Sequence, residues 1–428
     1  MKNIAVKPGF VNKKGYAGRM IKREEMPIYE GKNCAIIKKK QNERQFFMAD
    51  FKAFVEENRE LMLRTLKELC AIPAPSHQEG KRAEYCKRWL ETMGAKGVYI
   101  DDALNVIYPI NYEGSNELSV VAAHTDTVFP DLEPMHYEDR GATIHCPGIG
   151  DDTAAVVMIL LTAKYLIANN IQPEKGLLMV CNSCEEGLGD LKGTRQLFKD
   201  YAGRISRFVS FDSTINTMHA VSIGSHRYQV TVRTPGGHSL NKFGSPNALN
   251  ELAAMITKIY AIEVPRKEGS ITTYNVGVVN GGTSVNTIAQ EATMLCEYRS
   301  NDHSCLEIMK GRFEEIFRQG EKENVWVEVK QVGDRPCGKG VDPVRQQKLT
   351  ALCRSISEGV LGEPVKMTAA STDCNIPHSL GIPAAAMGIC KWNGIHTREE
   401  WIEKDSLIPG LEIALRAVLA LTEKEETV

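Results

Sequence analysis

Long apolar runs are missing from this chain of 428 residues. The best apolar stretch, Ala154 to Leu161, is far shorter than the ~20 residues that a membrane-spanning helix needs. The basic segment Met1 to Lys14 is followed by no apolar stretch of the kind found in a secretory signal. We therefore expect no membrane partner and a cytoplasmic protein.

The chain also lacks an excess of either charge sign. It has 52 Lys and Arg against 54 Asp and Glu, a formal charge of −2. Proteins that bind nucleic acid through its phosphates need a basic surface, so this balance gives no reason to expect a nucleic-acid partner.

A dense cysteine framework is also missing, because the twelve cysteines are scattered along the chain. We expect reduced thiols, as in cytosolic proteins. The pair Cys181 and Cys184 forms a CxxC motif, which is typical of redox sites and zinc knuckles. No second CxxC completes a set of four sulfurs, and a redox protein that uses this pair remains a minor alternative.

What the chain does contain is an ordinary globular composition, 43% hydrophobic and 25% charged. Its length predicts two or three domains. Residues 1–47 are basic and aperiodic, and we interpret them as a loose N-terminal extension, with a binding arm as the alternative. We expect a catalytic domain in two parts, residues 48–218 and 335–428, with a smaller domain at 219–334 inserted between them.

The periodicity predicts an α/β fold. Helical spacing begins near Ala49, and the segment Ser76 to Glu79 has the pattern of a capping box, which predicts a helix from there to Gly94. Further on, short apolar runs alternate with helical stretches, which indicates a mixed, mostly parallel sheet. Residues 225–332 follow the order β-α-β-β-α-β, which is the ferredoxin-like pattern.

Ionisable residues follow four of the apolar runs. The runs 118–123, 176–184, 207–211 and 383–390 lead to His124, Glu185 with Glu186, Asp212, and a loop that reaches His396. Open α/β sheets bind ligands at the carboxyl ends of their strands. We therefore expect these side chains to meet at one edge of the sheet.

Several of these residues have a simpler interpretation when each is taken alone. His124 with Asp126 could be a core histidine with its acceptor, or a metal ligand with the acid that orients it. Asp151 and Asp152 follow a Gly-rich turn before a long apolar helix, so they could cap that helix or present a carboxylate to metal. Glu185 and Glu186 are the stronger signal, because adjacent acids after a buried run are costly to desolvate without a nearby cation.

Together, two histidines and several carboxylates suit zinc, with manganese or cobalt as alternatives. Two divalent ions carry +4, which three carboxylate ligands and one hydroxide would balance. The charge count therefore favours two ions over one.

These motifs, in this order over residues 49–428, resemble the di-zinc amidohydrolases and metallopeptidases that include aminoacylase, carboxypeptidase G, acetylornithine deacetylase, succinyl-diaminopimelate desuccinylase and the bacterial tripeptidases. The resemblance implies a zinc-exopeptidase-like catalytic domain with a ferredoxin-like lid that forms a homodimer. It implies that His124 and Asp212 bind one metal, that Glu186 and His396 bind the other, and that Asp151 bridges them.

The same resemblance implies roles for the remaining residues. Glu185 matches the general base and Asp126 the acid behind His124. His238, in Gly236-Gly237-His238-Ser239, matches a lid histidine that reaches the partner subunit's active site. Asn286 and Arg299 match lid elements that contact substrate, and Gly388 lies where the family has a Gly-Pro-Gly near the substrate. Thr153, where many relatives have Lys, and Ala289, where Pro is frequent, are departures, as is the Met-Gly-Ile at 387–389.

The expected function is hydrolysis of an amide bond in small peptides by a tripeptidase-like exopeptidase. In this family a water that bridges the two metals attacks the amide, and Glu185 would take its proton. An N-acyl amino acid deacylase with the same site is the alternative, and a non-catalytic dimeric binding protein is a more distant one.

Overall fold

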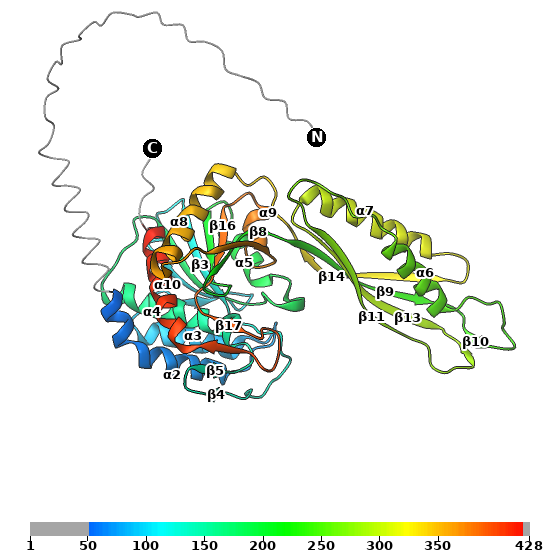
Figure 1. Ribbon diagram of the computed structural model, residues 1–428, viewed down its shortest axis with the longest axis horizontal. Coiled ribbons are helices and arrows are strands. Elements are labelled where there is room, and N and C mark those ends of the chain that lie inside the picture. The colour runs from blue at the N-terminus through cyan, green and yellow to red at the C-terminus, as the bar shows by residue number, and fades with distance from the viewer. Residues whose placement is uncertain (1–50, 423–428) are drawn as a thin grey trace, which may run out of the picture. The chain divides into compact units, whose positions relative to one another are not determined.

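The computed structural model describes residues 51–422. The expected extension at residues 1–47 lies outside this range. The largest sheet of the described residues has eight strands in the order β1-β2-β6-β3-β7-β16-β8-β15 (Figure 1). The strands are β1 (Tyr99–Ile100), β2 (Val106–Ile110), β3 (Leu118–His124), β6 (Gly176–Asn182), β7 (Ile205–Ser210), β8 (Thr217–Ser222), β15 (Lys366–Ala370) and β16 (Ala384–Met387).

The centre of this sheet is parallel, as the periodicity predicted. β3 pairs in parallel with both β6 and β7, and β16 pairs in parallel with β7, whereas β2 and β8 add antiparallel pairs. β3 and β6 are buried along their whole length. Strands buried on both faces read as continuous apolar runs, which explains why these segments stood out in the sequence.

Helices cover both faces of the sheet. One face packs against a core to which α2 (Arg59–Cys70), α3 (Gly80–Thr92), α4 (Ala154–Ala168), α8 (Pro343–Leu361) and α10 (Leu407–Thr422) contribute. The other face packs against α5 (Lys192–Asp200) and α9 (Asn375–Ser379). α4 is buried on nearly all sides because it lies between the sheet and its neighbouring helices, so it lacks a polar face.

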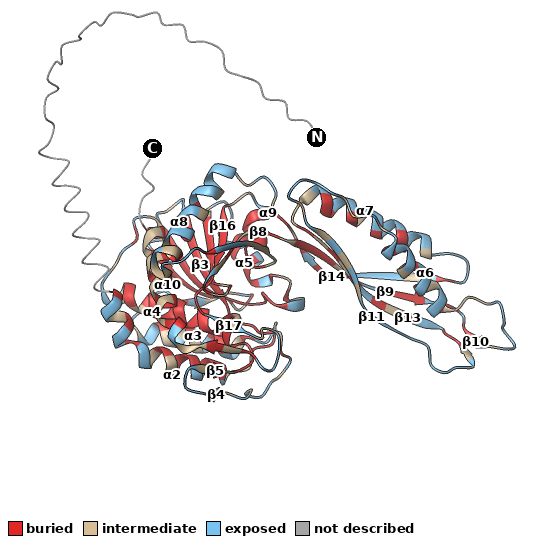
Figure 2. Ribbon diagram, viewed as in Figure 1, coloured by how far each residue is buried: buried red, intermediate tan, exposed pale blue. Residues whose placement is uncertain are grey.

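A second sheet has the ferredoxin-like topology that the sequence predicted. It is antiparallel in the order β11-β13-β9-β14, with strands β9 (Gly224–Arg233), β11 (Thr272–Gly281), β13 (Glu291–Ser300) and β14 (Trp326–Arg335). α6 (Ala248–Tyr260) and α7 (His303–Gly320) pack on one face of it, where their apolar side chains form a separate core. Figure 2 shows the buried residues of this part on the sides where helices and sheet meet. We call residues 224–335 the lid.

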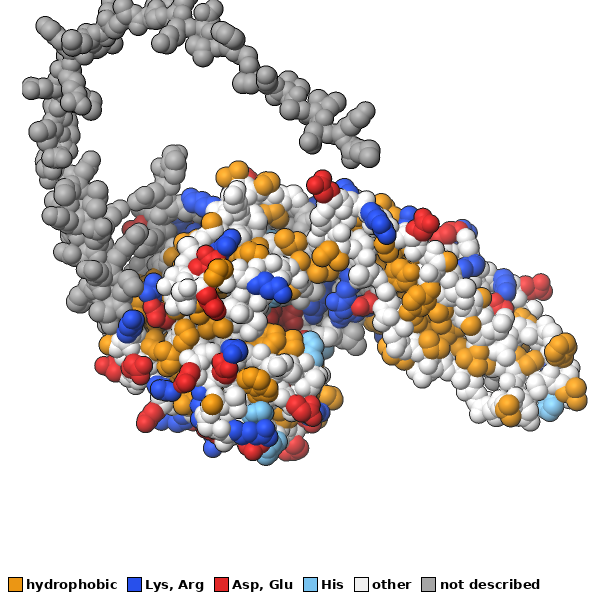
Figure 3. All heavy atoms as spheres, viewed as in Figure 1, with side chains coloured by type: hydrophobic (Ala, Val, Ile, Leu, Met, Phe, Trp, Pro, Cys, Tyr) orange, Lys and Arg blue, Asp and Glu red, His pale blue; other side chains and the backbone are white. Residues whose placement is uncertain are grey.

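Hydrophobic side chains remain exposed on the lid. They include Leu249 and Tyr260 on α6 and Ile308 on α7, and Figure 3 shows hydrophobic side chains gathered over these helices. A two-stranded ribbon of β10 (Gly237–His238) and β12 (Thr287–Ile288) also belongs to the lid.

The change from one sheet to the other falls close to the expected domain boundaries. β8 extends the large sheet to Ser222, so the boundary expected after residue 218 falls inside this strand. β14 extends the lid sheet to Arg335, the first residue of the expected second catalytic segment. The division into domains stays a prediction.

A small four-stranded sheet, β17-β18-β5-β4, lies near the Asp151 turn. Its strands are β4 (Glu138–Asp139), β5 (Thr143–His145), β17 (Trp392–Asn393) and β18 (Trp401–Glu403). Because β18 pairs with β5, the C-terminal loop that holds His396 and Glu400 runs beside the turn before α4. No helix of residues 51–422 has the length and apolar character that crossing a membrane requires.

The capping box expected at Ser76–Glu79 is wrong. α3 begins at Gly80 with Glu79 at its N-cap, and no side chain caps it. Ser76 instead donates to Asp126, and Glu79 accepts hydrogen bonds from the backbone N–H groups of His77 and Cys184. Both side chains thus bond to residues distant in the sequence, and neither caps the helix as the local pattern predicted.

Candidate metal and active site

The ends of neighbouring strands bring the expected ionisable residues together. His124 ends β3, and in the parallel register it lies opposite Asn182, the last residue of β6. Glu185 and Glu186 follow β6 after a short turn, and Asp212 follows β7. These strands are adjacent in the sheet, so their carboxyl ends deliver the side chains to one place.

Asp151 occupies the centre of this group. Its Oδ1 lies 3.0 Å from Nε2 of His124, and its Oδ2 lies 3.2 Å from Nε2 of His396. His396 Nε2 is also 3.2 Å from Oε1 of Glu186. The two oxygens of one carboxylate thus face two histidines that are 272 positions apart in the chain, His124 and His396.

Three overlapping sets of potential metal ligands result. Within each set the donor atoms all lie within 4.8 Å of one another, and the sets are His124 with Glu185 and Glu186, His124 with Asp151 and Asp212, and Asp151 with Glu186 and His396. Asp151 is shared by the last two, which hold the residues that the sequence analysis assigned to separate ions. The donor set of imidazoles and carboxylates therefore fits a pair of divalent cations.

The electrostatics of the cluster point the same way. Burial and the charge of Asp151 raise the pKa of Glu186 to about 7 and raise that of Asp212 well above its usual range. Hydrogen bonds with Asp151 and Glu186 raise the pKa of His396 to about 10. The site holds more negative charge than its own histidines balance, and bound cations would offset this excess.

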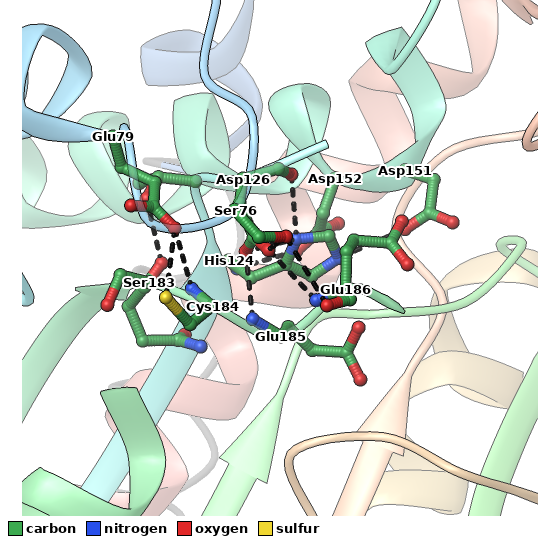
Figure 4. Close-up of polar contacts among 12 residues, drawn as sticks. Ser76, Glu79, His124, Asp126, Asp151, Asp152, Ser183, Cys184, Glu185 and Glu186 are labelled. Atoms are coloured by element: carbon green, nitrogen blue, oxygen red, sulfur yellow. Dashed lines mark hydrogen bonds and ion pairs between the residues drawn. The ribbon is translucent and has the colours of Figure 1, made fainter. Parts of the chain in front are cut away.

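Asp126 contacts both His124 and the turn that carries Glu185 and Glu186 (Figure 4). Its two side-chain oxygens accept from the backbone N–H groups of Glu185 and Glu186, both at 2.9 Å. His124 Nδ1 lies 3.5 Å from the Asp126 carboxylate and 3.1 Å from its backbone oxygen. Burial would raise the pKa of Asp126, but hydrogen bonds from His124 and Ser76 hold it below its usual value. Asp126 therefore orients His124 and also fixes the turn that carries both glutamates.

The turn that carries Asp151 depends on a residue that the sequence analysis missed. The buried carboxylate of Glu400 accepts from the backbone N–H groups of Gly148 and Gly150, each at 2.7 Å, and of Asp151 at 3.0 Å. The helix-capping interpretation of Asp151 and Asp152 is wrong, because neither side chain caps α4 and Asp152 accepts from His124 N–H at 3.0 Å. No local pattern marks Glu400, which lies 249 positions from Asp151.

A second missed residue contacts the expected general base. Arg335, at the end of β14, is 4% exposed, and its guanidinium lies 3.0 Å from Oε1 of Glu185 and also bonds the Glu185 backbone oxygen. The opposing charge of Glu185 keeps the pKa of Arg335 raised despite its burial. Nothing in the local sequence around Arg335 predicted this pair.

Next to the cluster lies a cavity of about 420 Å³. The cluster residues Asp151, Glu185, Glu186, Asp212 and His396 line it, together with His219, which the sequence analysis did not single out, and three arginines, Arg227, Arg299 and Arg335. A volume of this size suits a small ligand.

The remaining expected substrate residues lie elsewhere. His238 is in β10, Asn286 directly precedes β12, and Ser239 N–H donates to the Asn286 backbone oxygen. Neither residue lines the cavity. Gly388 does not line it either. A Cβ at this position would lie 1.8 Å from the Thr214 backbone oxygen. Close packing against the Thr214 backbone thus explains why position 388 is a glycine. Arg299 is the one residue of this expected set that lines the cavity among the described residues.

The two cysteines of the CxxC motif are buried free thiols. Cys184 Sγ lies 3.3 Å from Glu79 Oε1 (Figure 4). It also lies 3.4 Å from His77 Nδ1. Burial raises the pKa of Cys184 to about 12, with Glu79 adding to the shift. A thiol with so high a pKa is a poor nucleophile, which argues against redox use of the pair.

The chain is similar to known proteins in sequence and in fold. The chain is 23% identical over 342 residues to a succinyl-diaminopimelate desuccinylase from Corynebacterium glutamicum, an alignment that covers 78% of this chain and 89% of the relative. Its fold is similar to that of a tripeptidase from Staphylococcus aureus subsp. aureus mu50, with a TM-score of 0.68, 19% identity and coverage of 85% of this chain and 99% of the other. Aminopeptidase PepT from Bacillus cereus ATCC 10987 gives a TM-score of 0.67, 20% identity and coverage of 86% and 99%.

The family model described as "Peptidase family M20/M25/M40" matches residues 120–420, which include every candidate metal ligand. The large sheet and its ferredoxin-like insertion therefore have the architecture expected from the resemblance. The chain belongs to peptidase family M20/M25/M40 and is an enzyme of the peptidase and amidohydrolase type.

Proposed function

We propose that this enzyme hydrolyses an amide bond at the end of small peptides, as a tripeptidase-like exopeptidase that uses two divalent metal ions. The observation that carries the proposal is the position of Asp151, whose two oxygens face His124 and His396. A carboxylate placed in this way is suited to be shared between two ions.

We assign His124 and Asp212 to one ion, Glu186 and His396 to the other, and Asp151 to both. Zinc is the first candidate for these ligands, and cobalt and manganese are the alternatives. When bound, such ions lower the pKa of a coordinated water towards ~7 and polarise the substrate carbonyl.

Glu185 is the proposed general base and later the general acid. Glu185 lines the cavity next to the proposed metal ligand Glu186. From this position the Glu185 carboxylate can take a proton from the attacking water and pass it to the leaving amine. Asp126 fixes the backbone of the Glu185 turn, and Arg335 holds the Glu185 carboxylate in place.

The lid would bind and enclose the substrate. Arg299 lines the cavity and is the candidate anchor for a substrate carboxylate. We infer that His238 stabilises the developing oxyanion and that Asn286 contacts substrate, both from the second subunit of a homodimer. Exposed apolar side chains near this ribbon, Leu240, Phe243 and Val285, support an intermolecular position.

A cytoplasmic location completes the proposal. All eleven cysteines of residues 51–422 are free, which is compatible with a reducing compartment.

The test is hydrolysis of a mixed panel by protein loaded with zinc, cobalt or manganese. The panel holds free di- and tripeptides, the same peptides with blocked N-termini, and N-acetyl and N-succinyl amino acids. Cleavage of free but not blocked tripeptides, abolished by a chelator and restored by metal, is the expected result. Absence of amide hydrolysis with all three metals would refute the proposal.

A Glu185→Gln variant tests the base. We expect kcat to fall by roughly 10²–10⁴-fold while metal is still bound, because the ligands are unchanged. The matched control is Glu403→Gln, which removes a surface carboxylate paired with Lys391. Near-normal turnover by Glu185→Gln would show that the role is wrongly assigned.

A deacylase that acts on N-acyl amino acids is the second candidate. It is favoured by the sequence relative, a desuccinylase, at 23% identity. Cleavage of acyl amino acids alone, with free peptides left intact, would move the enzyme to this class without changing the proposed metal ligands.

A further inference from the structure

The chain connects the lid to the rest of the molecule through two segments that lie close together. It enters the lid at Ile223, between β8 and β9, and leaves it at Pro336, directly after β14. We call Ile223 and Pro336 the two lid crossings. A Cβ at Gly224 would lie 2.9 Å from the Arg335 backbone oxygen, so the two backbones approach this closely because position 224 has no side chain.

One side chain bonds both lid crossings. Asn375 Nδ2 donates to the Ile223 backbone oxygen at 2.9 Å and to the Pro336 backbone oxygen at 2.8 Å. Its Oδ1 accepts from the Thr372 backbone N–H at 3.0 Å. Asn375 is 0% exposed and is the first residue of α9, which lies where the lid meets the large sheet (Figure 1). The amide nitrogen and the amide oxygen are thus both used, and any movement of the side chain weakens at least one bond.

The segment that carries Asn375 is fixed to the catalytic part. Two residues before it, the buried carboxylate of Asp373 accepts from Asn182 Nδ2 at 2.6 Å and from Thr194 Oγ1. Asn182 is the last residue of β6, shortly before Glu185, and Thr194 lies on α5. Asn375 therefore joins the two lid crossings to the strand end that carries the proposed general base.

The second lid crossing adjoins the arginine that contacts this base. Arg335 directly precedes Pro336, and its Nη1 lies 3.0 Å from Glu185 Oε1 and donates to the Ser371 hydroxyl at 3.3 Å. Ser371 and Thr372 line the cavity. A displacement of the Pro336 backbone would move Arg335, which orients the Glu185 carboxylate. Misplacement of a reacting group by ~1 Å can lower the rate by about 10²-fold.

We propose that Asn375 is a positioning residue, which acts through the Ile223 and Pro336 backbones to hold Arg335 against Glu185. The inference rests on the proposed function, in which Glu185 transfers the proton. A side chain that only supplied donors to two carbonyl groups would contribute to stability and leave kcat of the folded enzyme unchanged. A positioning residue should instead change kcat, and only while Arg335 is present.

The first experiment removes the two donors and keeps the rest of the side chain. Asn375→Asp has nearly the same shape and still accepts from the Thr372 N–H, but it presents no N–H group to either lid crossing. The metal-loaded full chain is assayed with the substrate that the wild type cleaves best. We expect unchanged metal content and a kcat that is lower by roughly 10- to 100-fold, with KM changed by less than about 3-fold.

The matched control is Asn58→Asp. Asn58 is also buried, donates to the Phe54 backbone oxygen at 2.7 Å and accepts from Lys164 Nζ, and it does not line the cavity. Its replacement removes a buried amide donor to a backbone carbonyl far from the lid crossings in the sequence. This variant should have the kcat of the wild type.

A double-mutant cycle tests the path through Arg335. Arg335→Gln should itself lower kcat, because it removes the charged partner of Glu185. When Asn375→Asp is added to Arg335→Gln, kcat should fall by less than about 3-fold more, since the contact that Asn375 maintains is already lost. If the effects of the two substitutions multiply, Asn375 does not act through Arg335 and the inference is overturned.

Hydrogen–deuterium exchange of the metal-loaded full chain gives a readout without turnover. Peptides that cover residues 222–226 and 334–338 should exchange roughly 10-fold faster in Asn375→Asp, because both lid crossings lose a hydrogen bond. Asn58→Asp should leave the exchange of these peptides unchanged. If Asn375→Asp does not fold, Asn375→Ala, which places no charge near the two carbonyl groups, replaces it in every comparison.

A kcat within about 3-fold of wild type in the folded Asn375 variant would overturn the inference, while amide hydrolysis by the wild type would still support the proposed function. If the wild type hydrolyses no amide, the proposed function fails, and hydrogen exchange then decides whether Asn375 holds the lid crossings. Unchanged exchange at both crossings would overturn the inference, and faster exchange confined to the Asn375 variant would support it.

Discussion

Replacing Glu400 with glutamine should loosen the turn that presents Asp151. Glu400 is fully buried and accepts three backbone N–H bonds, from Gly148 through Oε2 and from Gly150 and Asp151 through Oε1. The glutamine is almost the same size, so it creates no cavity. It keeps one acceptor oxygen and places an NH₂ group where the other was.

The magnitude follows from these bonds. At least one N–H loses a charged acceptor and faces a donor instead. Hydrogen bonds to charged groups contribute about 1.5–3 kcal/mol each, and a buried N–H without a partner costs about 1–3 kcal/mol. We therefore expect a loss of about 2–4 kcal/mol in the free energy of unfolding. Groups that orient metal ligands typically change metal affinity by about 10–100-fold, and we expect weaker binding by such a factor.

The assay is denaturant unfolding of the chelated protein, followed by metal titration against a competing chelator. Burial and the charge of Asp151 raise the pKa of Glu400 to about 8, so unfolding is measured near pH 9, where the carboxylate is ionised. The control is Glu403→Gln, three residues along the chain, which breaks a surface pair with Lys391 and should change stability by less than about 1 kcal/mol. If Glu400→Gln matches this control in both measurements, the carboxylate does not organise the turn.

Two further predictions concern packing and pH. Gly388→Ala should lower the free energy of unfolding by about 3 kcal/mol or more, because its Cβ would lie 1.8 Å from the Thr214 backbone oxygen; denaturant unfolding within about 1 kcal/mol of wild type would contradict this packing role. Burial lowers the pKa of His378 to about 4, against ~6.5 in the unfolded chain. As the pH falls, the unfolded state therefore takes up the proton first. The contribution of the neutral His378 to the free energy of unfolding thus declines between about pH 6.5 and 4. Relative to His378→Asn, the wild type should lose about 2 kcal/mol between pH 7.5 and pH 5, and parallel stability curves of the two proteins would show that His378 does not titrate in this way.

The sequence by itself determined the helices and strands, their order, and which ionisable residues follow the buried strands. Strands such as β3 and β6 are buried on both faces, so their apolar runs were visible without a structure, and the residues that follow them had to meet at the carboxyl edge of a parallel sheet. The β-α-β-β-α-β order of the lid was equally local, because alternation and helical spacing are properties of short windows. His124, Glu186, Asp212 and His396 could be selected in this way, whereas Asp151 was singled out by the Gly-rich turn before a long apolar helix.

The tertiary structure alone decided which side chains support that cluster. Glu400 holds the Asp151 turn and Arg335 holds Glu185, and these pairs are 249 and 150 positions apart in the chain. Ser76 and Glu79 showed a clear capping pattern, yet Asp126 and the backbone at Cys184 are their partners in the folded chain. The physical reason is shared by all of these residues. A buried polar group must find a partner, and the partner is set by which segments packing brings together, a relation that spacing along the chain does not record.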